Sequence, residues 1–158
     1  GEWIVYKFLN TNVDEVEVTN LIYDSSNFEL SMNFIGVVSG AKIKQGNIVL
    51  LSPRFSQGLV DITEPDKPAY FENAFEFESN ISYRLGGSVR VIELPSGIDL
   101  NQEKLSYQYS CSDQGNTISE KRKITINTIY ADSANLEEKT RFMEAVNQSY
   151  EQPIKLTN

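Results

Sequence analysis

The sequence predicts a mainly β fold, an antiparallel β-sandwich with one C-terminal α-helix. Most of the chain alternates between apolar and polar side chains, which is the pattern of half-buried strands. Clusters of Gly, Asn, Asp, Ser and Pro separate these runs at short intervals, with no helical pattern between them. Because 158 residues suit about one domain, we expect residues 1–158 to form a single domain. The one candidate seam is 53–68, which contains three prolines.

The clearest predicted strand covers 75–85. Phe75 and Phe77 lie on one face of this segment, and Glu76 and Glu78 lie on the other. One face is therefore expected to pack against a core while the other faces water. The same period of two predicts strands at 105–111, 28–34, 16–22 and 124–126.

Three other segments depart from simple alternation. Residues 3–9 and 48–51 are apolar on both faces, which indicates central or sandwiched strands. Between 89 and 94 the alternation shifts by one residue, which predicts a β-bulge. In the 16–22 strand, strict alternation places on one face Val16, Val18 and Ile22.

One helix is expected near the C-terminus. Asn135 is its candidate N-cap, and Glu138 follows three residues later in a capping-box arrangement. Pro153 ends the helix, and 154–156 then predicts a last short strand or a tethering tail. Lys139 lies off the apolar stripe and is expected to face solvent. The stripe itself consists of Leu136, Phe142, Met143, Val146 and Tyr150.

Composition excludes several classes of function. The chain has no His, so it holds no Ser-His-Asp triad, no Cys-His nucleophile pair and no His-ligated metal. Its single Cys permits neither an internal disulfide nor a Cys-rich zinc site. The formal charge of −8, without a basic block, disfavours nucleic acid and anionic membranes as partners. We therefore expect a protein that is not an enzyme, with no catalytic residues, no cofactor and no metal.

Membrane insertion is not expected either. No stretch approaches 18 consecutive apolar residues. The sequence also lacks the basic segment and apolar run of a signal peptide. Because the chain begins at Gly1 without a Met, we interpret it as an excised or processed piece of a longer protein.

Two residue types leave catalysis open. Cys111 closes the apolar face of the 105–111 run, and without His its activator would have to be Lys or Arg. We interpret it as a buried structural thiol. Glu72, Glu76 and Glu78 are spaced for paired-carboxylate chemistry. Glu76 and Glu78 lie on the polar strand face, however, where charges usually discourage edge pairing or face solvent.

Acidic loops offer a candidate calcium site at two places, 14–17 and 61–66. Oxygen ligands of this kind suit Ca²⁺. Neither loop has the EF-hand spacing or a Gly at the sharp turn, so we expect solvated loops rather than a metal site.

Aromatic residues supply the candidate contact surface. They form 11% of the chain, and most of them fall on the apolar parity of a strand, where a core role is expected. A few aromatic residues have no such core position, and they would suit a platform on which sugar rings stack. The segment after the 48–51 strand would suit a contact between domains. The candidate contact residues are Tyr6, Tyr23, Arg54, Phe55, Tyr70 and Phe71.

A series of short motifs follows in order along 48–158. An apolar strand ends in a Leu-Ser-Pro turn, and later come a Leu-Pro-x-Gly element, an aromatic strand, a basic strand ending in Ile-Asn, and a helix with an Ile-x-Leu tail. The segments are Leu51-Ser52-Pro53, Ile92–Gly97, Tyr107-Gln108-Tyr109, Lys121–Asn127, Leu136 with Phe142, and Ile154-Lys155-Leu156.

In this order the motifs resemble the β-rich accessory domain, a domain of unknown function, that follows the core in transglutaminase-like proteins of Gram-negative bacteria. The aromatic-proline segment expected near Pro68 is only loosely present as 67–71, and the usual Tyr before Leu136 is missing. Residues 2–47 carry no such resemblance. The family's Cys-His-Asp chemistry lies in an upstream core, and no residue of this chain matches it.

The resemblance implies a noncatalytic accessory domain of an exported bacterial protein, located in the periplasm or at the cell surface. Its role would be to pack on or cap the upstream transglutaminase-like core, or to hold another protein domain. The alternative is a stand-alone glycan- or cell-surface-binding β-sandwich module, which requires an exposed aromatic row. A third hypothesis, a carboxylate hydrolase, requires a cleft with two acids about 5–10 Å apart.

Overall fold

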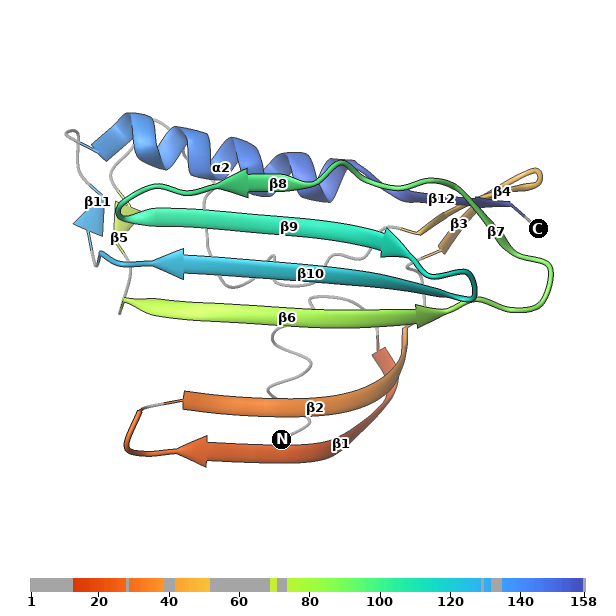
Figure 1. The fold of residues 1–158 in the computed structure, drawn as a ribbon, viewed down its shortest axis with the longest axis horizontal. Helices are drawn as coiled ribbons and strands as arrows, with labels where there is room; N and C mark the ends of the chain where they lie inside the picture. Colours follow the sequence, from red (N-terminus) through yellow and green to blue (C-terminus); the bar gives the residue numbers. More distant parts are fainter. Residues whose placement is uncertain are drawn as a thin grey trace. The chain divides into compact units, whose positions relative to one another are not determined.

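The structure is mainly β, as predicted, with one α-helix among the residues that it describes (Figure 1). The computed structural model describes residues 13–27, 29–38, 42–51, 69–70, 74–128, 130–131 and 135–157. The chain divides into two compact units, residues 1–43 with 53–61 and residues 44–52 with 62–158. The predicted strand at 3–9 and the candidate seam at 53–68 lie outside the described residues.

In the first unit, β1 (Val13–Asp24) and β2 (Glu29–Val38) form an antiparallel hairpin. The carboxylate of Asp24 organises its turn. It accepts hydrogen bonds from the Ser26 amide at 2.8 Å and from the Asn27 side chain at 2.9 Å. These bonds stabilise the ionised form and lower the pKa of Asp24. The hairpin therefore closes through an Asx turn.

The faces of β1 differ from the prediction. A β-bulge interrupts the pairing between Val18 and Asn20, and the extra residue reverses the alternation beyond it. Ile22, expected beside Val18, consequently lies on the other face, opposite Ser31. The bulge brings six apolar residues onto one side, which we call the apolar hairpin face. They are Val18, Leu21, Tyr23, Leu30, Met32 and Phe34.

The second unit is built on a sheet of four strands in the order β6-β10-β9-β8, here called the long sheet (Figure 1). Its inner face carries the odd-numbered residues of β6 and β9 and the even-numbered residues of β10. The outer face is polar and mostly exposed, as the alternation predicts. The strands are β6 (Phe75–Arg84), β8 (Ile98–Leu100), β9 (Leu105–Asp113) and β10 (Thr117–Ile126).

A second sheet, the C-terminal sheet, has the order β3-β4-β12-β7. The predicted last strand is therefore present, and it lies between two strands that precede it in the chain. The predicted bulge is present at Ile92, where the pairing of β7 with β12 shifts register. The strands are β3 (Lys42–Gln45), β4 (Ile48–Leu51), β7 (Arg90–Glu93) and β12 (Ile154–Thr157), and a separate short pair joins β5 (Ala69–Tyr70) to β11 (Tyr130–Ala131).

The C-terminal sheet packs on the inner face of the long sheet. Val49 of β4 and Ile154 and Leu156 of β12 form one buried cluster with Ile118 of β10. Because side chains from both sheets interdigitate in this cluster, the arrangement is sandwich-like, in agreement with the predicted fold class.

The helix α2 (Leu136–Glu151) packs along β8 and β9 of the long sheet (Figure 1). The ring of Phe142 meets Tyr107 of β9 edge to face, with centroids 6.4 Å apart. Phe142, Met143 and Val146 are buried, which confirms the centre of the predicted stripe. The prediction for Lys139 is wrong: this side chain is only 3% exposed.

The start of α2 confirms the N-cap but not the capping box. Asn135 occupies the N-cap without a side-chain capping bond. The carboxylate of Glu138 accepts hydrogen bonds from the backbone amides of Lys104 at 2.6 Å and Leu105 at 2.9 Å. Gln102 in turn donates to the Glu138 carbonyl at 2.9 Å. Tertiary bonds to the start of β9 thus replace the local bond that the sequence suggested.

Candidate functional site

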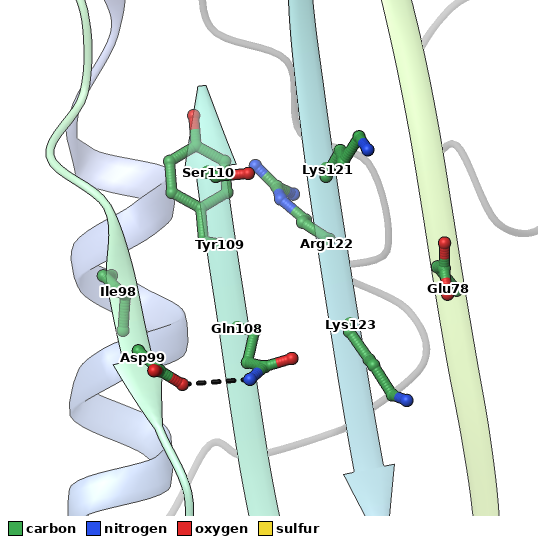
Figure 2. Close-up of a pocket in the computed structure, with 9 residues that line it drawn as sticks. All are labelled: Glu78, Ile98, Asp99, Gln108, Tyr109, Ser110, Lys121, Arg122 and Lys123. Atoms are coloured by element: carbon green, nitrogen blue, oxygen red, sulfur yellow. Dashed lines mark hydrogen bonds between the residues drawn. The ribbon is translucent and has the colours of Figure 1, made fainter. Parts of the chain in front are cut away.

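A hollow of about 380 Å³ opens on the long sheet (Figure 2). Alternation along the strands directs polar side chains from neighbouring strands into it. Tyr109 and Arg122 also contribute to its lining, although by parity both belong to the inner face. The polar residues that line it are Glu78, Asp99, Gln108, Ser110, Lys121 and Lys123.

The polar groups of the hollow are only partly paired with one another. Gln108 donates a hydrogen bond to Asp99 at 3.0 Å, drawn in Figure 2. Lys123 forms an ion pair with Glu76 at 2.9 Å. In the described part of the chain, the Lys121 ammonium has no hydrogen-bond or ion-pair partner. The hollow therefore offers an amide, carboxylates and one available cation for reversible hydrogen bonding.

On the inner face, β10 carries a buried ion pair. The guanidinium of Arg122 lies 3.2 Å from the carboxylate of Glu120, and both residues are 3% exposed. Tyr83 donates a hydrogen bond to Glu120 at 2.7 Å. The Arg122 guanidinium also lies over two rings, 5.1 Å from the centroid of Tyr109 and 4.8 Å from that of Tyr150. Such cation–π contacts stabilise a desolvated guanidinium.

The surroundings favour the charged form of Arg122 and the protonated forms of Tyr83 and Tyr109. Burial raises the pKa of Tyr83 and of Tyr109, and the nearby Glu120 charge raises it further. Burial alone would lower the pKa of Arg122, but the neighbouring tyrosines and Glu120 outweigh it and raise that pKa. A charged pair surrounded by neutral phenols is a structural network, not a set of groups prepared for proton transfer.

Cys111 lies on the inner face, as its parity predicts, and packs against the buried cluster between the sheets. It is a free thiol of intermediate exposure rather than a fully buried one. Burial and the Glu120 carboxylate raise its pKa from 9.0 to about 11. A thiol in such surroundings stays protonated near neutral pH and is a poor nucleophile.

Of the six candidate contact residues, the structure describes the side chain of one. Tyr23 is 62% exposed on the apolar hairpin face, opposite Leu30. Leu30 and Leu21 on the same face are 47% and 46% exposed. For Tyr70 only the backbone is described, in β5. Outside the described residues lie Tyr6, Arg54, Phe55 and Phe71.

The acidic candidates do not form a site in the described segments. Glu76 and Glu78 are exposed on the outer face of the long sheet, and Glu72 lies outside the described residues. Of the two candidate calcium loops, 14–17 belongs to strand β1, and 61–66 is not described. Among the residues described, no group of three Asp, Glu or Cys is placed to hold a metal ion. Nor does any described helix have the length and apolar character needed to cross a membrane.

Sequence reasoning missed the Glu120–Arg122 pair and the residues of the hollow. The signal for the pair was present, because both residues share the parity of Ile118 and Ile124 on β10. The hollow had no such signal, since it depends on which strands are neighbours. No family model, no curated protein and no solved structure matches this chain.

Proposed function

We propose that this chain is a noncatalytic interaction module of a larger protein, and that the apolar hairpin face is the surface that holds a neighbouring protein domain. The observation that carries this proposal is the exposure of Leu21, Tyr23 and Leu30 on one face of the hairpin. Contiguous exposed apolar side chains are characteristic of protein–protein contacts. Tyr, here at the turn end of the face, is a residue type enriched at interaction hot spots.

The noncatalytic part of the proposal is supported by the protonation of the groups that a reaction would need. The Cys111 thiol has a raised pKa and an acidic neighbour in Glu120. The two buried charged groups of the inner face, Glu120 and Arg122, already bind each other. Neither arrangement offers an activated nucleophile.

The motifs of 48–158 support a transglutaminase-like core as the neighbouring domain, in an exported bacterial protein. In this proposal the long and C-terminal sheets form the scaffold, and the hairpin supplies the contact. The location follows from the same resemblance and is the periplasm or the cell surface.

Site-specific photo-crosslinking in the parent protein tests the contact. A benzophenone amino acid replaces Tyr23 in one variant and Ile22 in the other. Both positions are exposed, at 62% and 54%, and they lie on opposite faces of the same strand. We expect crosslinks from position 23 to a protein segment outside residues 1–158, and few from position 22. Equal crosslinking from both positions, or none from position 23, would contradict the proposal.

An activity assay tests the noncatalytic part separately. The isolated chain is incubated with amine donors and Gln-containing peptides, and we expect no transamidation or hydrolysis. Turnover that is lost in Cys111→Ser would show that the thiol is catalytic after all.

The hollow of the long sheet favours a second candidate, a glycan-binding module. Asp99, Gln108 and Lys121 are the kinds of side chain that hydrogen-bond sugar hydroxyls. Tyr109, the aromatic residue among those lining it, is only 3% exposed, so sugar stacking would have to come from elsewhere. Titration with oligosaccharides, followed by NMR, distinguishes the glycan-binding module from the protein-interaction module. Oligosaccharide binding that is lost in Gln108→Ala and kept in Ser82→Ala would favour the glycan-binding module.

A further inference from the structure

The outer edge of β6 is the feature that points to a further interaction. β6 is the terminal strand of the long sheet (Figure 1), and by the strand order no other described strand pairs with its second edge. It runs for ten residues, and its register with β10 is continuous from Phe75 to Arg84 without a bulge. Long edges of this kind accept another strand unless bulges, prolines or unfavourable charges prevent it, so the charges along this edge decide which strand can pair.

The direction of the free backbone groups follows from one hydrogen bond. The Leu85 amide donates to the carbonyl of Asn116 at 2.8 Å, at the end of the β6–β10 ladder. Because bonded and non-bonded pairs alternate in an antiparallel ladder, the odd-numbered residues of β6 bond to β10. The even-numbered residues therefore direct their N–H and C=O groups toward the edge that no described strand occupies. These residues are Glu76, Glu78, Asn80, Ser82 and Arg84.

The charges on this edge are self-complementary. Two carboxylates lie at one end of the strand, on Glu76 and Glu78, and a guanidinium lies at the other, on Arg84. An antiparallel copy with its twofold axis at Asn80 places Glu76 opposite Arg84 of the second copy, twice. Opposite charges facing each other across strands stabilise the pair. A parallel partner in register would instead place like charges together.

We propose that two copies of this chain associate through their β6 edges, forming a continuous antiparallel sheet of eight strands centred on Asn80. Five pairs of even-numbered residues then exchange backbone hydrogen bonds, because the N–H and C=O groups of these residues point toward the second copy. On the inner side, Phe77 lies opposite Tyr83 of the second copy. The interface is isologous, so it closes as a dimer and does not propagate into a fibre.

Charge reversal with sedimentation equilibrium tests this proposal. We expect the 158-residue chain to show a reversible monomer–dimer equilibrium between about 1 μM and 1 mM, where small polar interfaces lie. Glu76→Arg places two Arg opposite each other at both ends, and Arg84→Glu does the same with two Glu. Each variant is expected to weaken the dimer about tenfold or more. Glu144→Arg, an equal charge change on the exposed side of α2, should leave the dimer unchanged.

Mixing experiments and a backbone variant make the result specific. A mixture of Glu76→Arg and Arg84→Glu chains should form the heterodimer, and the double variant in one chain should again dimerise. Asn80→Pro removes an edge-facing N–H without taking a bond from β10, so it should abolish the dimer, whereas Asn80→Ala should keep it. Circular dichroism confirms that each variant is folded. A wild-type chain that stays monomeric throughout, or a dimer that ignores these substitutions, would overturn the proposal.

Discussion

Glu120 and Arg122 form an ion pair within a single strand, 3.2 Å apart, with both side chains buried and the guanidinium over Tyr150 of α2. Residues two apart on a strand share a face, which allows the contact. The exposed residue between them, Lys121, points to the opposite face. Substitutions in this pair therefore measure how much the stability of the core depends on buried charges.

Breaking this pair should destabilise the fold strongly. Arg122→Met leaves the Glu120 carboxylate buried without its cation, and we expect the free energy of unfolding to fall by about 3–5 kcal/mol. Adding Glu120→Gln removes the isolated charge, so the double variant should recover much of the loss. Urea unfolding measures both, with Lys121→Met as the control on the same strand. A loss below about 1 kcal/mol for Arg122→Met would contradict the network described here.

Glu138 should matter far more than its neighbour Glu137. Glu138→Ala removes the acceptor of two backbone amides, of Lys104 and Leu105, at a cost of about 1–3 kcal/mol. Glu137→Ala removes only an exposed ion pair with Arg141, worth about 0.3–0.5 kcal/mol. Chemical denaturation compares the two variants, and equal midpoints would show that Glu138 does not anchor the helix.

Phe142 is expected to be the principal anchor of α2 on the long sheet. Its ring is fully buried against Tyr107, so Phe142→Ala should cost about 3–5 kcal/mol. Glu144→Ala, two residues along on the exposed side, should change stability by less than about 0.5 kcal/mol. Thermal and urea unfolding provide the measurement. A small loss for Phe142→Ala would mean that α2 is an appendage.

The fold should lose stability at alkaline pH. Burial raises the pKa of Tyr107 to about 12 from an ordinary value of 10.0, and it raises those of Tyr83 and Tyr109 as well. Above pH 10 the unfolded chain therefore releases protons that the folded chain retains, so stability falls as pH rises. The stability that these protonated tyrosines contribute is fully present below pH 10. Phenolate absorbance should show some tyrosines ionising only as the chain unfolds; ionisation of all eight near pH 10 in the folded state would contradict this.

Cys111 should react slowly with thiol reagents. A pKa of about 11 instead of 9.0 lowers the thiolate fraction at pH 8 about a hundredfold, before any steric protection. The native chain should accordingly react at least about a hundredfold more slowly than the chain in denaturant. Fast stoichiometric labelling of the folded protein would place the thiol in a different environment.

Much of the fold could be predicted because alternation is a local property. The strand β6, most of β9, the end of β10, the centre of the stripe of α2 and the bulge within 89–94 followed from the identity of neighbouring residues, whereas β8 was not predicted. The bulge between Val18 and Asn20 did not, because the 16–22 run alternates acceptably in either register. Lys139 was assigned to the surface because it was placed off the apolar stripe. Its spacing of three and four residues from Phe142 and Met143 instead puts it on the buried side of α2.

The candidate site was less predictable because it depends on strand order. Asp99 and Gln108 are nine residues apart, and only the pairing of β8 with β9 brings them into one hydrogen bond. The Glu138 carboxylate likewise found its partners in a distant loop, which no capping rule anticipates. Tyr23 was identified from the sequence because its parity left it without a core role, and the structure leaves it exposed.

The position of β12 between β4 and β7 has a consequence for the order of folding. Ile48 pairs with Thr157, so the C-terminal sheet closes a loop of more than a hundred residues. β4 and β7 have no direct pairing with each other and must wait for residues 154–157 to emerge during synthesis. The β9–β10 hairpin, joined by the turn at Gly115, can form early from local contacts. We therefore expect docking of α2 and insertion of β12 to come late in folding, with the inner face of the long sheet exposed until they occur.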